Sequence, residues 1–191
     1  MQDIIIRDVR LLGWKPAGKE VLEVNFDTPI EWPINWAADK ADAYKGDVRV
    51  RIMAHGFESY IRTEGSDANG MCTEKHIYSQ GGDGIQFCKE NITIHTIGKF
   101  SKWKGKMKMI ELLSCGAAYI TPGKEGKQGD GNYFCYRFAQ ITGASVRAST
   151  ATQLYSYGTK DTGITFGKWE GMVYTYDSTG AVIKVEKEPE A

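Results

Sequence analysis

Two short apolar strings constrain this chain more than any other feature of its sequence. Residues 49–53 continue into Ala54-His55-Gly56, and residues 107–113 continue into Ser114-Cys115-Gly116. Each string has the pattern of a buried strand that ends in a chemically reactive side chain followed by a glycine. A thiol becomes a good nucleophile only when a base or a positive field favours the thiolate. The two strings therefore predict a histidine and a cysteine at the ends of neighbouring strands.

Apolar spacing and turn residues predict the remaining elements. We expect two strands within the first 30 residues, a helix over 33–43, a strand over 48–54, a long loop over 57–84, a short strand over 84–88, a helix over 91–103, a helix capped by Asn132 and ended by Gly143, a strand over 144–149, and a terminal hairpin with arms 169–176 and 181–185. Strands that alternate with helices indicate an α/β fold with a mostly parallel central sheet flanked by helices. Ligands of such sheets bind beyond the carboxyl ends of the strands, where His55 and Cys115 would lie.

Length and composition limit the classes of protein to consider. The 191 residues contain no repeat and no linker, so we expect a single domain over 1–191, with a charged, flexible tail at 186–191. The 24 basic and 24 acidic residues balance, which gives no general field for nucleic acid. No apolar run reaches the roughly 20 residues of a membrane span.

The start of the chain and the cysteines indicate a reducing compartment. The first residues lack the basic region and apolar core of a secretory signal, so we expect a cytoplasmic protein where it is made, with export only through a dedicated secretion system. The four cysteines, at 72, 88, 115 and 135, form no close pair and are expected to be reduced.

The order and spacing of the two strings resemble the caspase-like superfamily of cysteine peptidases (clan CD). The bacterial members of this group include gingipains, clostripain and the cysteine protease domains of large toxins. Residues 84–92, 114–118, 131–134 and 141–149 are similar to bacterial caspase-like domains, so the resemblance covers 48–175. The N-terminal strand and helix region, 1–47, has no match beyond a first strand and helix.

The resemblance implies a three-layer caspase-like fold with a C-terminal β-hairpin and a cysteine endopeptidase without cofactor or metal. Cys115 would be the nucleophile, and His55 would polarise the thiol and protonate the leaving amine. The backbone N–H groups of Gly56 and Cys115 would form the oxyanion hole, where preorganised donors are worth about 3 kcal/mol. A bacterial effector or toxin is the implied setting, acting on a protein or peptide substrate.

The resemblance also implies that the strand over 146–150 and the loop after it line the pocket for the residue that precedes the cleaved bond. The candidate substrate-binding residues are Ser114, Arg147, Ser149, Thr150, Asp130 and Asp161. The two aspartates would suit a basic side chain, whereas Arg147 would suit an acidic one. The aromatic loop 155–158 is a further candidate for substrate contact.

Several alternatives stay open at this stage. Cys115 could be a buried structural thiol, and the chain could be a non-catalytic caspase-like binding module or a thioester-forming acyltransferase. Cys72 and His76 have a loose metal-ligand spacing, but a structural zinc site needs two tight pairs. The glycine-rich stretch 123–131 is a candidate activation segment, and the partners to consider are an activator or, through the terminal hairpin, a second copy of the chain.

Overall fold

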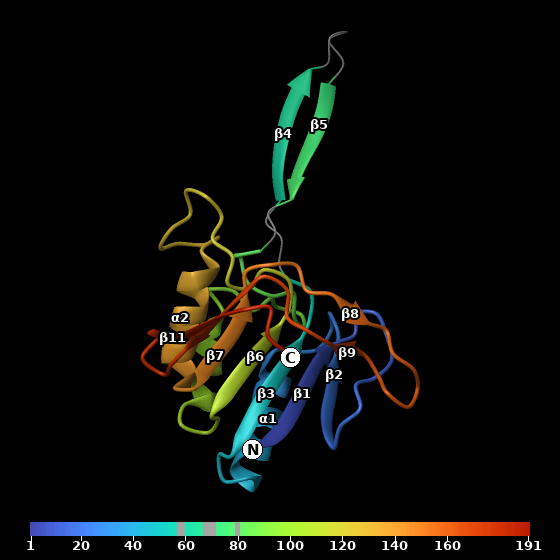
Figure 1. The fold of residues 1–191 in the computed structure, drawn as a ribbon, viewed down its shortest axis with the longest axis vertical. Coiled ribbons are helices and arrows are strands. Elements are labelled where there is room, and N and C mark those ends of the chain that lie inside the picture. The colour runs from blue at the N-terminus through green and yellow to red at the C-terminus, as the bar shows by residue number, and fades with distance from the viewer. Residues whose placement is uncertain (57–59, 67–71, 79–80) are drawn as a thin grey trace.

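A seven-stranded sheet forms the centre of the computed structural model (Figure 1). The structure describes residues 1–56, 60–66, 72–78 and 81–191, and for 60–66 and 72–78 only their backbone. The strand order is β11-β10-β7-β6-β3-β1-β2. The strands are β1 (Gln2–Asp8), β2 (Glu20–Val24), β3 (Val48–Met53), β6 (Met109–Leu113), β7 (Ser145–Ser149), β10 (Met172–Tyr176) and β11 (Val182–Lys187).

The sheet is parallel from β2 to β7, and β10 and β11 then pair antiparallel at one edge. This arrangement confirms the predicted α/β class with a mostly parallel sheet, and it confirms the terminal hairpin. The chain moves from β1 outward to β2, returns past β1 to β3, and then continues in the other direction to β6 and β7. Such a reversal creates a switch point between β1 and β3.

The helices α1 (Glu31–Ala43), η1 (Ile97–Trp103) and α2 (Gly131–Thr142) pack against one face of the sheet. In Figure 1, α1 lies behind the strands. Each of these helices belongs to a connection that moves in the same direction along the sheet, and right-handed crossovers then place them all on the same side. The opposite crossover, from β1 to β2, is the helix-free segment 9–19. The expected flanking helices thus cover one face, and loop segments cover part of the other.

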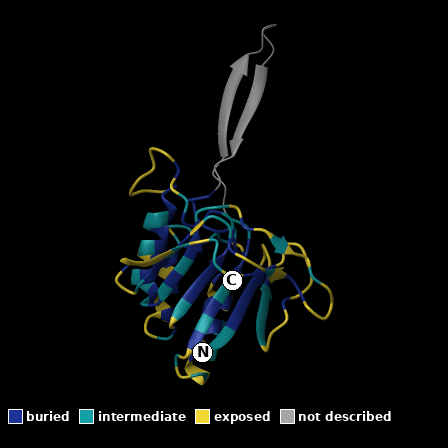
Figure 2. Cartoon of the chain, in the orientation of Figure 1, coloured by how far each residue is buried: buried dark blue, intermediate teal, exposed yellow. Residues whose placement is uncertain are grey.

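The alternation along β3 shows how the sequence assigns the two faces. Val48, Val50 and Ile52 are fully buried against the helices, whereas Arg49 and Arg51 are partly exposed and form ion pairs with Asp3 and Glu111 on the opposite face. In Figure 2, buried and intermediate residues alternate along the central strands. On that face a second, smaller apolar cluster lies near the carboxyl ends of the strands. It contains Ile5, Leu11, Met53, Leu113, Ile164, Trp169 and Val173.

The predicted long loop over 57–84 is wrong in two places. Residues 60–66 and 72–78 form the antiparallel strands β4 (Tyr60–Ser66) and β5 (Cys72–Tyr78), which pair from Tyr60 with Tyr78 to Ser66 with Cys72. The loop was predicted because residues 64–70 and 79–84 are rich in glycine, serine, aspartate and asparagine, which are typical of turns and loops. A smaller antiparallel pair is formed by β8 (Tyr155–Ser156) and β9 (Thr165–Phe166).

The predictions for 84–88 and 91–103 also need correction. The first segment makes only isolated bridges, and the second is helical only in η1. The hydroxyl of Thr96 donates to the Asn91 carbonyl and accepts from the Thr93 N–H, and such local bonds compete with helix formation.

Specific hydrogen bonds form at both ends of α2 and at the end of the chain. The N-cap of α2 is Asp130, whose side chain accepts a hydrogen bond from the Tyr133 N–H, and not Asn132 as predicted. Gly143 ends this helix in the left-handed conformation, as expected. Residues 186–191, predicted as a flexible tail, form hydrogen bonds with the rest of the chain: the Trp169 N–H donates to the Pro189 carbonyl, and the Ala191 N–H donates to the Gly167 carbonyl.

Candidate active site

The parallel pairing of β3 and β6 brings the two predicted reactive residues to the same edge of the sheet. Met53 pairs with Leu113, and the Ala54 N–H donates to the Leu113 carbonyl at 3.3 Å. His55 lies two residues after Met53, and Cys115 lies two residues after Leu113. A β-carbon built on Gly56 would lie 2.0 Å from the Cys115 carbonyl oxygen, so the two segments are in contact immediately beyond the strands.

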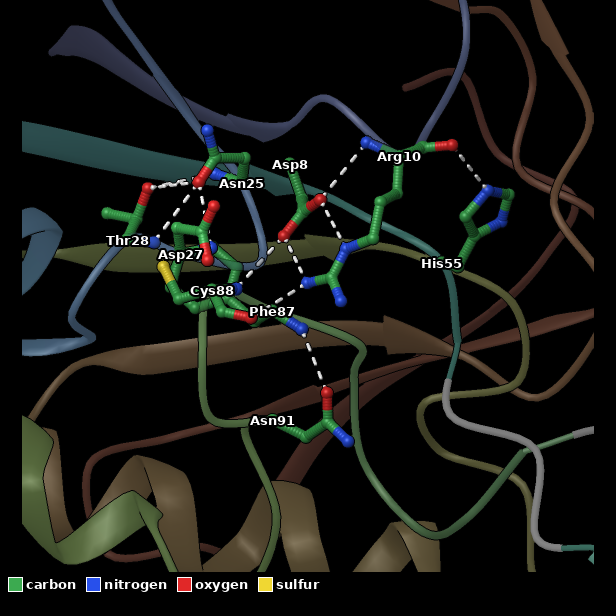
Figure 3. A network of polar contacts seen from close by, with 9 residues as sticks. All are labelled: Asp8, Arg10, Asn25, Asp27, Thr28, His55, Phe87, Cys88 and Asn91. Atoms are coloured by element: carbon green, nitrogen blue, oxygen red, sulfur yellow. Dashed lines mark hydrogen bonds and ion pairs between the residues drawn. The ribbon is translucent and has the colours of Figure 1, made fainter.

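His55 is held by a backbone carbonyl that the sequence did not single out. Its Nε2 atom lies 3.1 Å from the carbonyl oxygen of Arg10, in the turn that follows β1 (Figure 3). A carbonyl oxygen only accepts hydrogen bonds, so Nε2 must carry the proton. In the neutral ring Nδ1 is then unprotonated and able to accept a proton. The contact lies at the β1–β3 switch point, which only the strand order reveals.

Cys115 is half-buried, and its sulfur faces the segment that follows β7. The Gln153 N–H lies 3.4 Å from Sγ and donates to it. The next residue, Gly116, donates its N–H to the Ala151 carbonyl at 2.8 Å. Two backbone contacts therefore fix the position of the thiol against residues 151–153.

The two other cysteines whose side chains are described are buried thiols. Burial, together with the nearby Asp8 carboxylate, raises the pKa of Cys88 to about 12. Complete burial also raises the pKa of Cys135 far above its ordinary range. Neither forms the thiolate near neutral pH, so among these three cysteines Cys115 is the one with both access to solvent and a histidine beside its strand.

Backbone donors are available where an oxyanion hole was predicted. Among the residues that the structure describes, neither the Gly56 N–H nor the Cys115 N–H donates a hydrogen bond. Buried or half-buried N–H groups are usually paired. These two N–H groups lie on adjacent segments beside a thiol and have no acceptor among the described residues, which leaves room for an external acceptor.

A surface pocket of about 510 Å³ begins at the residue that contacts the sulfur. It is lined by Gln153, Leu154, Tyr155, Ser156, Tyr157 and Gly158. Leu154 is 69% exposed and Tyr157 is 59% exposed, so apolar surface is open to solvent next to Cys115. The aromatic loop predicted to contact substrate forms this pocket.

A second pocket, of about 410 Å³, lies beside the segment that follows Cys115. Its lining residues are Ala118, Ile120, Asn132, Thr150, Tyr174 and Val182. The Ala118 N–H donates to the Ser149 carbonyl, which joins this pocket wall to the end of β7. Thr150, one of the predicted substrate-binding residues, lines this pocket.

Two predicted substrate-binding serines are buried. Ser149 is fully buried, and its hydroxyl donates to the Glu170 carbonyl and accepts from the Ala151 N–H. It therefore supports the carbonyl that holds Gly116. Ser114 is 1% exposed, and its Oγ has no hydrogen-bond partner among the described residues. As placed, neither hydroxyl is open to a substrate.

The three charged candidates for substrate binding either bind other residues of the chain or lie at its surface. Arg147 lies 3.3 Å from Glu111 and 3.4 Å from Glu186, and its guanidinium stacks on Trp169. Both oxygens of Asp130 are used, by the N–H groups of Tyr133 and Gly126. Asp161 is exposed in the turn between β8 and β9. Among the described residues, none of these three forms a hydrogen bond or an ion pair with Cys115.

The alternative of a metal site was based on Cys72 and His76. The side chains of Cys72 and His76 lie outside the described residues. Elsewhere, no cluster of three or more metal-ligating side chains occurs among the residues that are described. Within the same described ranges, no helix has both the length and the apolar character needed to cross a bilayer.

Comparison of the chain with protein-family models, with curated proteins and with solved structures finds no match.

Proposed function

We propose that the chain is a caspase-like cysteine endopeptidase in which Cys115 is the nucleophile and His55 is the acid and base. The observation that carries this proposal is the contact between the His55-Gly56 and Cys115-Gly116 segments beyond paired strands. It joins a half-buried thiol, a histidine whose Nε2 faces a carbonyl, and two backbone N–H groups that donate to none of the described residues. Nucleophile, base and oxyanion donors are the parts that acyl transfer requires.

In the first step the Cys115 thiolate attacks the carbonyl carbon of a peptide bond. The carbonyl electrons move to the oxygen, which accepts hydrogen bonds from the N–H groups of Gly56 and Cys115. Protonated His55, which holds its Nε2–H on the Arg10 carbonyl, donates the Nδ1 proton to the departing nitrogen. The C–N bond breaks, and a thioester and a free amine result.

In the second step water attacks the thioester carbon. Neutral His55 accepts a proton from this water at Nδ1 as the new C–O bond forms. The C–S bond then breaks, which releases a carboxylic acid and restores the thiolate with protonated His55. An amine in place of the water would give acyl transfer by the same steps, so the acyltransferase alternative shares this site.

The second candidate function is a non-catalytic binding module. The exposed Leu154 and Tyr157 beside the 510 Å³ pocket favour contact with an extended apolar segment, which either function would use. The two candidates differ in the behaviour of Cys115. A nucleophile reacts covalently with a carbonyl electrophile, whereas a binding residue does not.

The test exposes the protein briefly to a library of peptide acyloxymethyl ketones and measures its intact mass. The starting protein carries Cys72→Ser, so that the thiols present are Cys88, Cys115 and Cys135. Cys115→Ala and His55→Ala are compared with it, and His95→Ala, which changes an exposed histidine at the protein surface, is the matched control. We expect one adduct, on Cys115, formed at least about 10-fold more slowly in His55→Ala and normally in His95→Ala.

An adduct that persists in Cys115→Ala, or equal labelling in His55→Ala, would contradict the proposal. If no peptide ketone reacts selectively, even after addition of a cell extract as a source of activator, the binding module becomes the better description. Hydrolysis and transfer are separated by incubating a reactive peptide ester with and without a primary amine.

A further inference from the structure

The carbonyl that holds His55 is itself fixed by an ion pair between the buried carboxylate of Asp8 and the partly exposed guanidinium of Arg10. Arg10 belongs to the turn after β1, which is closed by a 3.0 Å hydrogen bond from the Leu11 N–H to the Asp8 carbonyl. The carboxylate of Asp8 accepts from the Arg10 backbone N–H at 3.1 Å, from Nε at 2.8 Å and from Nη2 at 2.6 Å. The Asp8 side chain is 1% exposed. The backbone N–H and two guanidinium nitrogens of Arg10 all donate to Asp8, so both the backbone and the side chain of Arg10 are fixed.

The same ion pair holds a distant segment of the chain (Figure 3). Arg10 Nη2 donates to the Cys88 carbonyl at 3.0 Å, and the Cys88 N–H donates to Asp8 at 2.9 Å. Cys88 has a φ of 48°, a left-handed conformation that non-glycine residues seldom adopt. The ion pair thus provides partners for a turn whose backbone would otherwise be unfavourable.

These contacts form a closed circuit around His55. The ring of His55 bonds to Arg10, the side chain of Arg10 bonds to Cys88, and two residues before Cys88 the Gln86 N–H donates to the His55 carbonyl at 2.9 Å. The imidazole and the backbone of His55 are consequently held by the same unit. A displacement of Arg10 would alter both.

We propose that Asp8 and Arg10 are positioning residues for His55. Their ion pair fixes the Arg10 carbonyl, and the carbonyl selects the Nε2–H tautomer and the orientation of the ring. Burying the Asp8 carboxylate carries a desolvation cost that offsets much of the attraction to Arg10, so stability alone does not account for this ion pair. The catalytic consequence of the Asp8–Arg10 pair rests on the proposed function. Its effect on the tautomer of His55 does not depend on that function.

The experiment measures the tautomer of His55 directly, by long-range ¹H–¹⁵N NMR of protein labelled at histidine. The signals of the three histidines are assigned with the substitutions His55→Gln, His76→Gln and His95→Gln. The test variants are Asp8→Asn and Arg10→Gln. Asp3→Asn is the matched control, because Asp3 accepts a similar two-point ion pair from Arg49, at 2.8 and 2.7 Å, at the opposite end of β1.

We expect the Nε2–H tautomer in the wild type and in Asp3→Asn, and a mixture of tautomers in Asp8→Asn and Arg10→Gln. The maximal rate of Cys115 labelling by the selected ketone should fall at least about 10-fold in the two test variants, with little change in the ketone concentration that gives half of this rate. Arg10→Lys keeps the charge but loses the planar fork, so it should give an intermediate result. If Asp8→Asn does not fold, Arg10→Lys serves as the test variant in its place.

An unchanged tautomer and an unchanged labelling rate in folded Asp8→Asn or Arg10→Gln would overturn the proposal. A tautomer change in a protein whose wild type reacts with no ketone would support the positioning role and reject the proposed peptidase. Failure of the positioning role and failure of the proposed peptidase therefore give different results.

Discussion

The α-carbon of Gly56 lies against the backbone carbonyl of Cys115. A β-carbon at residue 56 would come within 2.0 Å of the carbonyl oxygen and 2.9 Å of the carbonyl carbon. Both atoms belong to backbone, so neither can move aside as a flexible side chain would. Glycine is required here because it allows two backbone segments to meet closely.

Gly56→Ala should therefore displace the His55 segment from the Cys115 segment. We expect the free energy of unfolding to fall by about 1–3 kcal/mol, since the extra methyl group overpacks a closed contact. Labelling of Cys115 should slow about 100-fold, because small misplacements of reacting groups have large kinetic effects. Urea denaturation and ketone labelling measure the two effects.

The matched control is Gly98→Ala in η1, where an added β-carbon would meet nothing within 4 Å. Its stability should stay the same or rise slightly, and its labelling should be unchanged. Wild-type behaviour of Gly56→Ala would show that the two segments can separate without consequence.

Gln153→Ala should loosen the segment that faces the Cys115 sulfur. The Gln153 side chain is 4% exposed and donates to the carbonyls of Ala151 and Glu170, both at 3.0 Å. Loss of this buried donor should cost about 1–3 kcal/mol of unfolding free energy. Because Ala151 holds Gly116, Cys115 labelling should also slow. Gln128→Ala, an exposed change, is the control, and equal labelling rates in both variants would argue against this role of Gln153.

Glu111→Gln should destabilise the protein strongly. Glu111 is fully buried on the helix-free face and lies within ion-pair distance of Arg49, Arg51 and Arg147. Removing its charge leaves three arginines without their common partner, which we expect to cost about 3–5 kcal/mol. Glu188→Gln, which breaks only an exposed pair with Lys168, should cost less than about 1 kcal/mol. Similar losses in the two variants, measured by urea denaturation, would contradict this expectation.

Stability should decrease at alkaline pH in part through Cys88. Its thiol has an ordinary pKa of 9.0 in the unfolded chain and a pKa of about 12 in the folded protein. As the pH rises from 9 to 12, the unfolded state loses this proton and the folded state keeps it, so the free energy of unfolding falls. Urea denaturation across this range should show a shallower decline for Cys88→Ala than for the wild type. Gly98→Ala should follow the wild type, and parallel curves for all three proteins would refute the assignment.

Local patterns predicted the main elements of the fold. The alternation of Val48, Val50 and Ile52 with Arg49 and Arg51 was sufficient to identify β3, since a strand has a period of two residues. Gly143 was sufficient to place the end of α2, because its left-handed conformation favours glycine. Asp130 was missed as the cap since the neighbouring Asn132 is an equally good capping residue.

Weaker local signals failed where side chains bond to nearby backbone. A helix was predicted over 91–103, but within 91–96 the hydroxyl of Thr96 forms local bonds to Asn91 and Thr93 that compete with a helix. The strands β4 and β5, which pair over seven positions, were missed because the turn-type residues of 64–70 and 79–84 indicated a loop.

The sequence by itself determined that one strand would end in His55-Gly56 and another in Cys115-Gly116, and that the sheet joining them would be mostly parallel. These conclusions depend on periods and on residue types that lie next to one another. Only the tertiary structure decided that the Arg10 carbonyl would hold His55, that the Gln153 N–H would face Cys115, and that Arg147 would bind Glu111. Each of these contacts joins segments from 36 to 45 residues apart in the chain, so it exists only once the strand order and register are formed.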